Sequence, residues 1–400
     1  MKNYIVLTIL LCSIMSCSSI TTEMHNVTVT DSLKHTDTAV AAPKPAPVVE
    51  RNPAADRIAR FIAGLNQTDS NELSHLQTGA DWKNFKVVFD SLWVRMEAER
   101  LNKQRKWVGE YMKEVTPETK SLFYPFSGAD FLNSNVFFPD AEKTVMIGLE
   151  PAGNMPDLNK FSKDSLDRYF GKIRKSLYSI LKFSFYQTKA MAKDFKNQEI
   201  DGTLPNILIF LARNGNTIAD VAPVNINNKG VAEVKKFSDS KNPKYKGLKI
   251  TYFAKDSEVL RELLYFSADI SNLGFRQDTA FFKYLSSLDF DATFLKSASF
   301  LMHKDYFSDI RTLILNKSEY VLQDDSGVPF RFFKSGWNTK VFGTYDRPIA
   351  LFSNYYQEGF KKAYADTANV GKLPFGIGYD WKTNQSNLML AKKNRNKNGK

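Results

Sequence analysis

Three pairs of strand-like segments, each joined by a short polar turn, dominate the chain beyond residue 200. The first turn contains Asn214-Gly215, a dipeptide typical of tight hairpins, and the third is Asp324-Asp325-Ser326-Gly327. Because the two arms of a hairpin pair with each other, these units predict a largely antiparallel sheet. The arms are residues 207–212 and 217–226, 247–254 and 260–269, and 320–323 and 328–333.

Segments with helical periodicity surround these pairs. The clearest is residues 166–181, whose apolar positions fit a 3.6-residue period without a miss. We find no internal repeat and no β-α-β series with crossover spacing, so the pattern predicts an α+β fold with a helical N-terminal part packed on a hairpin-built sheet. Residues 144–150 form one further strand in this prediction. The other predicted helices are residues 58–65, 85–112, 279–288, 293–315 and 356–365.

The predicted globular body covers residues 53–391. With 43% apolar and 13% aromatic residues, the chain has ample material for a large core. No Gly/Ser-rich linker interrupts the body, which favours a single domain. The tail 392–400 is basic and is expected to be disordered; together with Lys2 it accounts for six of the twelve net positive charges.

The N-terminus has the layout of an export signal. Lys2 precedes an apolar run from Tyr4 to Ile14 that is too short to span a bilayer. The run ends at Ile14-Met15-Ser16-Cys17, which resembles the lipobox of bacterial lipoproteins. The resemblance implies removal of the signal peptide 1–16, diacylglycerol on the Cys17 sulfur and acylation of the new amino group. The body would then be held to a membrane by its lipids.

Residues 17–52 are predicted to form a lipidated, disordered tether. The segment has no aromatic residue and contains the run Ala-Pro-Lys-Pro-Ala-Pro, so it cannot bury enough surface to order itself. Ser18 follows Cys17 and no acidic cluster is near, which by resemblance to bacterial sorting rules implies an outer-membrane anchor facing the periplasm. The expected partners are the membrane and an envelope ligand or protein, and nucleic acid is not expected.

The cysteines and histidines exclude several kinds of chemistry. Cys12 leaves with the signal peptide and Cys17 carries lipid, so no thiol remains for catalysis or metal binding. His75 and His303 are the only histidines beyond the tether, which is too few for a conventional zinc site. The motifs of zinc peptidases, serine hydrolases and phosphate loops are absent, and we expect no cofactor and no metal.

One candidate site lies on the predicted helix at residues 293–315. Lys296, Ser299 and His303 would share one helical face, where a lysine or histidine beside a serine could activate its hydroxyl. The alternative is the solvated polar face of an amphipathic helix.

A second candidate is the turn that contains Asp324 and Asp325. Paired carboxylates can perform acid-base chemistry or hold a cation. Arg311 and Arg331 are close in sequence and could bind a ligand in the same polar cleft. The alternative is that these residues serve only a tight turn.

Glu150 is the third candidate, because it follows a predicted strand with glycines on both sides. A carboxylate at a strand end can act as a general base or fix a ligand, although an exposed turn is the alternative. We expect Glu150 to open into the same cavity as the other candidates. His303 should be partly buried beside a carboxylate, which would raise the pKa of its imidazole.

Together these features predict a lipoprotein that binds a ligand or an envelope partner through a polar cleft. The alternative is a hydrolase that acts on an envelope or imported polymer with Asp, Glu or His303 as acid and base.

Overall fold

The computed structural model describes residues 52–158, 163–183, 202–237 and 245–394. They belong to one compact unit, Val49–Lys400. The predicted signal peptide, Cys17 and nearly all of the tether lie outside the described residues, as do residues 395–400 of the tail.

A ten-stranded mixed sheet forms the centre of this unit. Its spatial order is β4-β3-β5-β6-β2-β1-β7-β8-β10-β9. The strands are β1 (Ser121–Tyr124), β2 (Lys143–Gly148), β3 (Thr217–Ile226), β4 (Ala232–Val234), β5 (Gly247–Phe253), β6 (Leu260–Ser267), β7 (Ala292–Leu295), β8 (Tyr320–Gln323), β9 (Trp337–Gly343) and β10 (Asn387–Lys393).

The middle of the sheet is parallel and its two margins are antiparallel. The neighbouring pairs among β6, β2, β1, β7 and β8 are all parallel. The pairs at the margins, β4-β3, β3-β5, β5-β6, β8-β10 and β10-β9, are antiparallel. The predicted α+β class is therefore confirmed, whereas the prediction of a sheet built from hairpins is wrong for the parallel centre.

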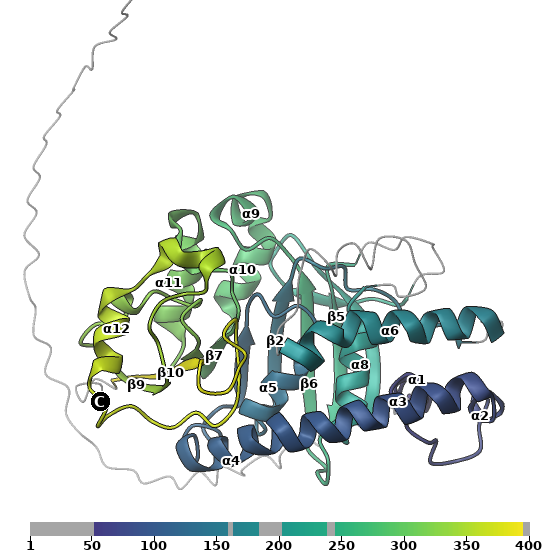
Figure 1. Cartoon of the computed structure of the whole chain (residues 1–400). Helices are drawn as coiled ribbons and strands as arrows, with labels where there is room; N and C mark the ends of the chain where they lie inside the picture. Colours follow the sequence, from purple (N-terminus) through teal and green to yellow (C-terminus); the bar gives the residue numbers. More distant parts are fainter. Residues whose placement is uncertain (1–51, 159–162, 184–201, 238–244, 395–400) are drawn as a thin grey trace, which may run out of the picture. The chain divides into compact units, whose positions relative to one another are not determined.

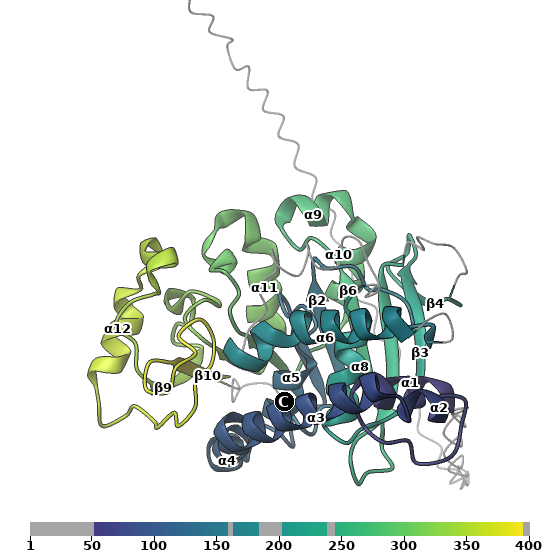
Figure 2. The same cartoon turned by 45° about the vertical axis from the view of Figure 1, so that its right-hand side comes forward.

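Helices cover both faces of the sheet, as Figures 1 and 2 show. Alternate residues of a strand enter different cores: Leu122 and Tyr124 pack in one core, and Phe123 packs in the other. The first core receives α1 (Pro53–Ile62), α3 (Ala80–Met96), α4 (Asn102–Tyr111), α5 (Phe131–Phe137), α6 (Lys163–Phe183) and α8 (Leu204–Arg213). The second receives α9 (Asn272–Gln277), α10 (Thr279–Ser287), α11 (Ser308–Lys317) and α12 (Glu358–Ala365).

Shorter elements connect these layers. The helix α2 (Ser74–Gln77) precedes α3, and a π-helical turn, η1 (Glu97–Leu101), joins α3 to α4. The 3₁₀ turns are η3 (Leu301–His303), η4 (Asp305–Phe307), η5 (Phe330–Phe332) and η6 (Ala350–Tyr355).

One of the three predicted hairpins forms as expected: β5 pairs antiparallel with β6. The first does not form, because residues 207–212 belong to helix α8, whose side chains from Leu204 to Ala212 are all buried. A mostly apolar helix that is buried on every side has no clear apolar-polar periodicity that separates it from a buried strand. Asn214-Gly215 ends this helix, and Gly215 takes the left-handed conformation at φ +80°.

The third predicted hairpin is also wrong, because residues 328–333 form no strand. The Gln323 side chain takes the place of a strand partner. Its amide donates to the Val328 carbonyl at 2.7 Å and accepts from the Val328 N–H at 2.9 Å. The predicted helix at residues 293–315 begins instead as strand β7, and only α11 in its second half is a regular α-helix.

Candidate functional site

A cavity of about 430 Å³ lies where the carboxyl ends of four parallel strands meet. This volume is within the range of small-molecule sites. Among the parallel strands, β2 and then β6 lie on one side of β1, and β7, which follows in the chain, lies on the other side. The cavity therefore lies at the point where the strand order reverses. It is lined by Tyr124, Phe126, Ser127, Gly128 and Asp130 after or at the end of β1, Ile147–Glu150 at β2, Ala268–Ile270 after β6, Lys296–Ser299 after β7, and Leu301 and Phe307.

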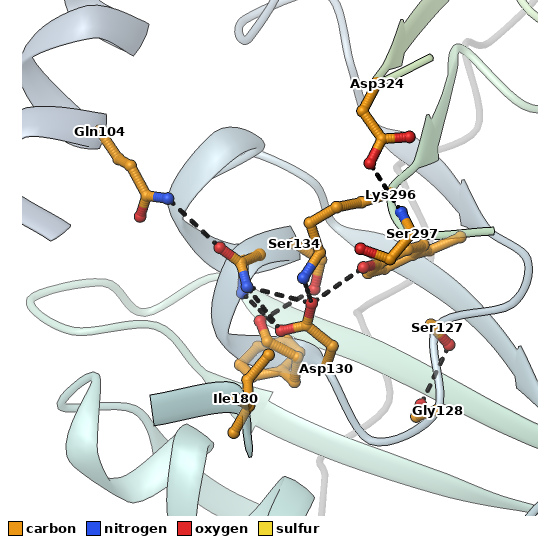
Figure 3. Close-up of polar contacts among 12 residues, drawn as sticks. Gln104, Ser127, Gly128, Asp130, Ser134, Ile180, Lys296, Ser297 and Asp324 are labelled. Carbon is orange, nitrogen blue, oxygen red and sulfur yellow. Dashed lines mark hydrogen bonds and ion pairs between the residues drawn. The ribbon is translucent and has the colours of Figure 1, made fainter. Parts of the chain in front are cut away.

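A buried ion pair forms one wall of the cavity (Figure 3). The Lys296 ammonium lies 2.6 Å from Asp130 Oδ2, and each side chain is only 2% exposed. The Tyr124 hydroxyl donates to the same oxygen at 2.9 Å, and the Asn133 backbone N–H donates to Asp130 Oδ1 at 3.1 Å. Burial lowers the pKa of Lys296, and the charge of Asp130 opposes that shift. These contacts fix both charges in one geometry.

Arg100 is a second buried cation near this ion pair. Burial lowers the pKa of Arg100 to about 10, and the charge of Asp130 opposes the shift. Its guanidinium donates to the Ile180 carbonyl at 3.0 Å. Gln104 donates to Asn133 at 3.4 Å (Figure 3). The wall of the cavity thus continues into a polar network between β1, α4 and α6.

Glu150 lies directly beyond the end of β2 and is only 4% exposed. The Tyr265 hydroxyl donates to its backbone carbonyl at 2.8 Å. A Cβ atom built on Gly148 would lie 2.6 Å from Glu150 Oε2 and 3.1 Å from the Cα of Gly128. The two glycines therefore leave room for the carboxylate between the ends of β1 and β2.

The loop after β7 has an unusual backbone. Ser297, Ser299 and Phe300 have φ between 52° and 53°, and Phe126 in the loop after β1 has φ 60°. Residues other than glycine are strained in this region, and such strain gathers at functional sites. Two strained loops therefore border the same cavity.

The Asp324–Gly327 turn and Tyr379 accept hydrogen bonds from the backbone of the strained loop. Ser297 N–H donates to Asp324 Oδ2 at 2.8 Å, and Ala298 N–H donates to the Ser326 hydroxyl at 2.7 Å. Ser299 N–H donates to the Tyr379 hydroxyl at 3.1 Å. Burial raises the pKa of Asp324, and the hydrogen bonds that its carboxylate accepts from Ser326 and from the Ser297 N–H oppose the shift. Asp324 thus positions the cavity wall and is not among the lining residues.

The structure brings three of the predicted site residues together: Glu150, Lys296 and Ser299 line the cavity. The predicted helical face is wrong, because Lys296 and Ser299 lie in the loop after β7 and His303 lies in η3. Asp325 is buried and its carboxylate accepts from Asn387 at 3.2 Å. Burial and the charge of Asp324 raise the pKa of Asp325 well above its usual value.

The predicted pKa of His303 is wrong in direction. Burial, with the charge of Arg331 second, lowers the pKa of its imidazole to about 4. The interaction that opposes the shift comes from the Asp325 backbone and not from a carboxylate. His303 packs against the rings of Phe300 and Tyr355, with centroids 5.1 and 5.5 Å away.

The two arginines predicted to bind a ligand also lie outside the lining. Arg311 donates to the Met302 carbonyl at 2.5 Å and to the Lys304 carbonyl at 3.2 Å, so it ties α11 to the turns before it. Arg331 is exposed, with its guanidinium carbon 5.0 Å from the ring centroid of Phe332.

Sequence reasoning missed Asp130, Asp269 and Ser297. Asp130 caps α5, and an acidic residue just before Phe131-Leu132 is a usual helix-start signal that could have located it. Asp269 is exposed at the end of β6. The Ser297 hydroxyl is buried and has no hydrogen-bond partner among the described residues.

The lining combines apolar surface with several hydroxyl groups and an excess of carboxylates. The lining includes three carboxylates, those of Asp130, Glu150 and Asp269, and one ammonium, that of Lys296, so its formal charge is negative. Such a wall favours neutral or cationic ligands with hydrogen-bond donors. Among the described residues, no group of three or more His, Cys, Asp or Glu side chains could hold a metal ion.

The described helices include none with the length and apolar character needed to cross a membrane. No protein-family model, curated protein or solved structure matches the chain.

Proposed function

We propose that this protein is an envelope lipoprotein that binds a small, hydroxyl-bearing molecule in the cavity at the carboxyl ends of β1, β2, β6 and β7. The observation that carries the proposal is a cavity with an acidic lining at the point where the strand order reverses. The fixed Lys296–Asp130 pair and the strained loop after β7 support it, because both preorganise the wall before any ligand enters.

Binding is favoured over hydrolysis. A hydrolase needs an acid and a base within reach of the bond it breaks. Of the residues predicted for acid-base chemistry, Glu150 lines the cavity, whereas His303, Asp324 and Asp325 do not. Of the two other lining carboxylates, Asp130 is paired with Lys296 at 2.6 Å and Asp269 is exposed. The low pKa of His303 leaves its imidazole neutral at neutral pH, and no lining histidine replaces it.

Thermal unfolding with a panel of hexoses, polyols and ribonucleosides, each at millimolar concentration, tests the binding proposal. We expect at least one class to raise the melting temperature of the full chain.

Leu149 lines the cavity and is 65% exposed, so Leu149→Arg should block binding with little cost to folding. Leu273→Arg, at a 53% exposed leucine outside the lining, is the matched control and should bind as the original chain does. Shifts that are absent, or that survive Leu149→Arg unchanged, would reject this cavity as a binding site.

The lipid anchor is a separate part of the proposal and rests on the lipobox-like segment that ends at Cys17. Cys17→Ala should abolish metabolic labelling with a fatty acid and prevent normal processing of the precursor. Membrane association and processing that continue unchanged in this variant would remove the lipoprotein assignment.

A further inference from the structure

We propose that the ligand of this cavity is a ribonucleoside without a phosphate group, whose ribose hydroxyls bind the Glu150 carboxylate. This inference rests on the binding function proposed above and names the class of ligand.

The strand order of the parallel centre is that of nucleotide-binding sheets. Numbered along the chain, the five parallel strands stand in the order third, second, first, fourth, fifth, that is β6-β2-β1-β7-β8. In open sheets of this order, nucleotides bind across the carboxyl ends beside the first strand. There, an acidic residue about 20 positions beyond the first glycine of the turn accepts from a ribose hydroxyl. Glu150 lies beyond the second parallel strand, 22 positions after Gly128.

The local geometry agrees with that role. Gly128 has φ 53°, so the backbone after β1 turns in a conformation that glycine adopts without strain. Gly148 leaves the space that the Glu150 carboxylate occupies beside it. A carboxylate has two oxygens, each able to accept more than one hydrogen bond, so it suits the two neighbouring hydroxyls of a ribose.

The neighbouring part of the lining suits a nucleobase. Leu149 after β2 and Ala268 and Ile270 after β6 supply apolar surface for a flat ring. Asp269 lies between the last two and is exposed, so its carboxylate can accept from an exocyclic amine at the rim.

The charges exclude a phosphate from the place where nucleotide sites usually hold one. That place is the N-terminal backbone of the helix after the first strand. In this protein the Asp130 carboxylate lies at the start of α5 and accepts from the Asn133 N–H at 3.1 Å. The Lys296 ammonium lies 2.6 Å from the Asp130 carboxylate, while Glu150 and Asp269 make the wall negative. A nucleoside with a neutral or cationic 5′ group therefore fits better than a nucleotide.

Calorimetric titration of the full chain with adenosine, guanosine, cytidine and uridine is the first test, and at least one of them should bind. The best binder is then compared with its 2′-deoxy, 5′-amino-5′-deoxy and 5′-monophosphate forms. We expect the 2′-deoxy form to bind roughly 10- to 100-fold more weakly, because a hydrogen bond to a charged acceptor is lost. The 5′-amino form should bind at least as tightly as the nucleoside, and the monophosphate at least about 10-fold more weakly.

The variant Glu150→Gln tests the residue. It should weaken nucleoside binding by roughly the same factor and bind the nucleoside and its 2′-deoxy form within about 3-fold of each other. Asp289→Asn, at an exposed carboxylate outside the cavity, should change neither affinity. If Glu150→Gln fails to fold, the 2′-deoxy comparison on the original chain still decides the question.

Several outcomes overturn the inference. They are the absence of nucleoside binding, equal affinity for the 2′-deoxy form, or a preference for the monophosphate. If hexoses or polyols shift the melting temperature while nucleosides do not, the binding function stands and the nucleoside inference fails.

Discussion

At the residue scale, folding moves the His303 imidazole from water into a partly buried place beside two arginines. Its ring is half-buried between Phe300 and Tyr355, and the charges of Arg331 and Arg311 oppose its protonation. Burial lowers the pKa of its imidazole from 6.5 to about 4. The folded protein therefore holds this histidine neutral over a pH range in which the unfolded chain protonates it.

This difference predicts an acid-dependent loss of stability. As the pH falls from about 6.5 to about 4, the unfolded chain binds a proton that the folded chain does not, so the free energy of unfolding decreases. The contribution of His303 is about 3 kcal/mol over that range. Urea unfolding of the original chain and of His303→Gln should show a steeper pH dependence in the original. Asp325, whose pKa is raised, acts in the opposite direction in both chains, so the difference between them isolates His303. Parallel pH profiles, or an NMR titration midpoint of His303 above 6.5, would contradict the prediction.

The residue types of the candidate site were partly predictable, and their partners were not. Glu150 was found because a carboxylate at a strand end is a local pattern. Lys296 and Ser299 were named for a helical face that does not exist, yet both line the cavity. Asp130 was missed because its partner Lys296 is 166 positions away in the chain, and only the folded sheet brings the two together.

At the element scale, the bend after β8 depends on one side chain. Gln323 is buried, and its amide makes both hydrogen bonds to the Val328 backbone. Its side chain also closely fills the space beside Gly327, where a Cβ atom would lie 2.5 Å from Gln323 Oε1. The amide thus replaces the antiparallel partner that the predicted hairpin would have supplied.

Gln323→Leu should therefore destabilise the bend, because the Val328 N–H and carbonyl lose their partners in a buried place. We expect the free energy of unfolding to fall by about 2 kcal/mol or more, measured by urea unfolding. Gln385→Leu, at an exposed glutamine, should change it by less than about 0.5 kcal/mol. Equal effects of the two substitutions would show that the Gln323 amide is not needed for the bend.

Local patterns identified most helices and the β5–β6 hairpin, because amphipathic periodicity and polar turns are properties of neighbouring residues. Local patterns failed for α8, which is buried on every side and so lacks an amphipathic period, and for short strands. β1 and β7 have four residues each, too few for an alternating pattern to be distinctive.

At the scale of the whole molecule, the parallel centre of the sheet could not be recognised from local spacing. β2 ends at Gly148 and its parallel neighbour β6 begins at Leu260, and α6, α8 and the strands β3 to β5 lie between them. Such a long insertion hides the regular strand-helix-strand alternation that would have predicted a parallel sheet. The reversal of strand order, and with it the place of the cavity, follows only from the assembled sheet.

Helix α1 marks the N-terminal limit of the described part of the folded unit. α1 is its first described helix, and it contacts β3: Asp56 accepts from the Ile218 N–H at 2.9 Å. Phe61 is fully buried and packs against the rings of Trp82 and Phe170. A chain beginning at Arg51 keeps these contacts, whereas a chain beginning at Leu65 loses the whole helix.

We expect the chain that begins at Arg51 to melt within about 2 °C of the mature protein, because only the predicted tether is removed. The chain that begins at Leu65 should lose at least about 3 kcal/mol of unfolding free energy, since removal of one buried phenylalanine side chain alone costs that much. Thermal and urea unfolding of the three chains measure both effects. A markedly earlier melt of the chain from Arg51 would mean that residues 17–50 belong to the folded core. Equal stability of the two shortened chains would mean that the contacts of α1 with β3 do not stabilise the fold.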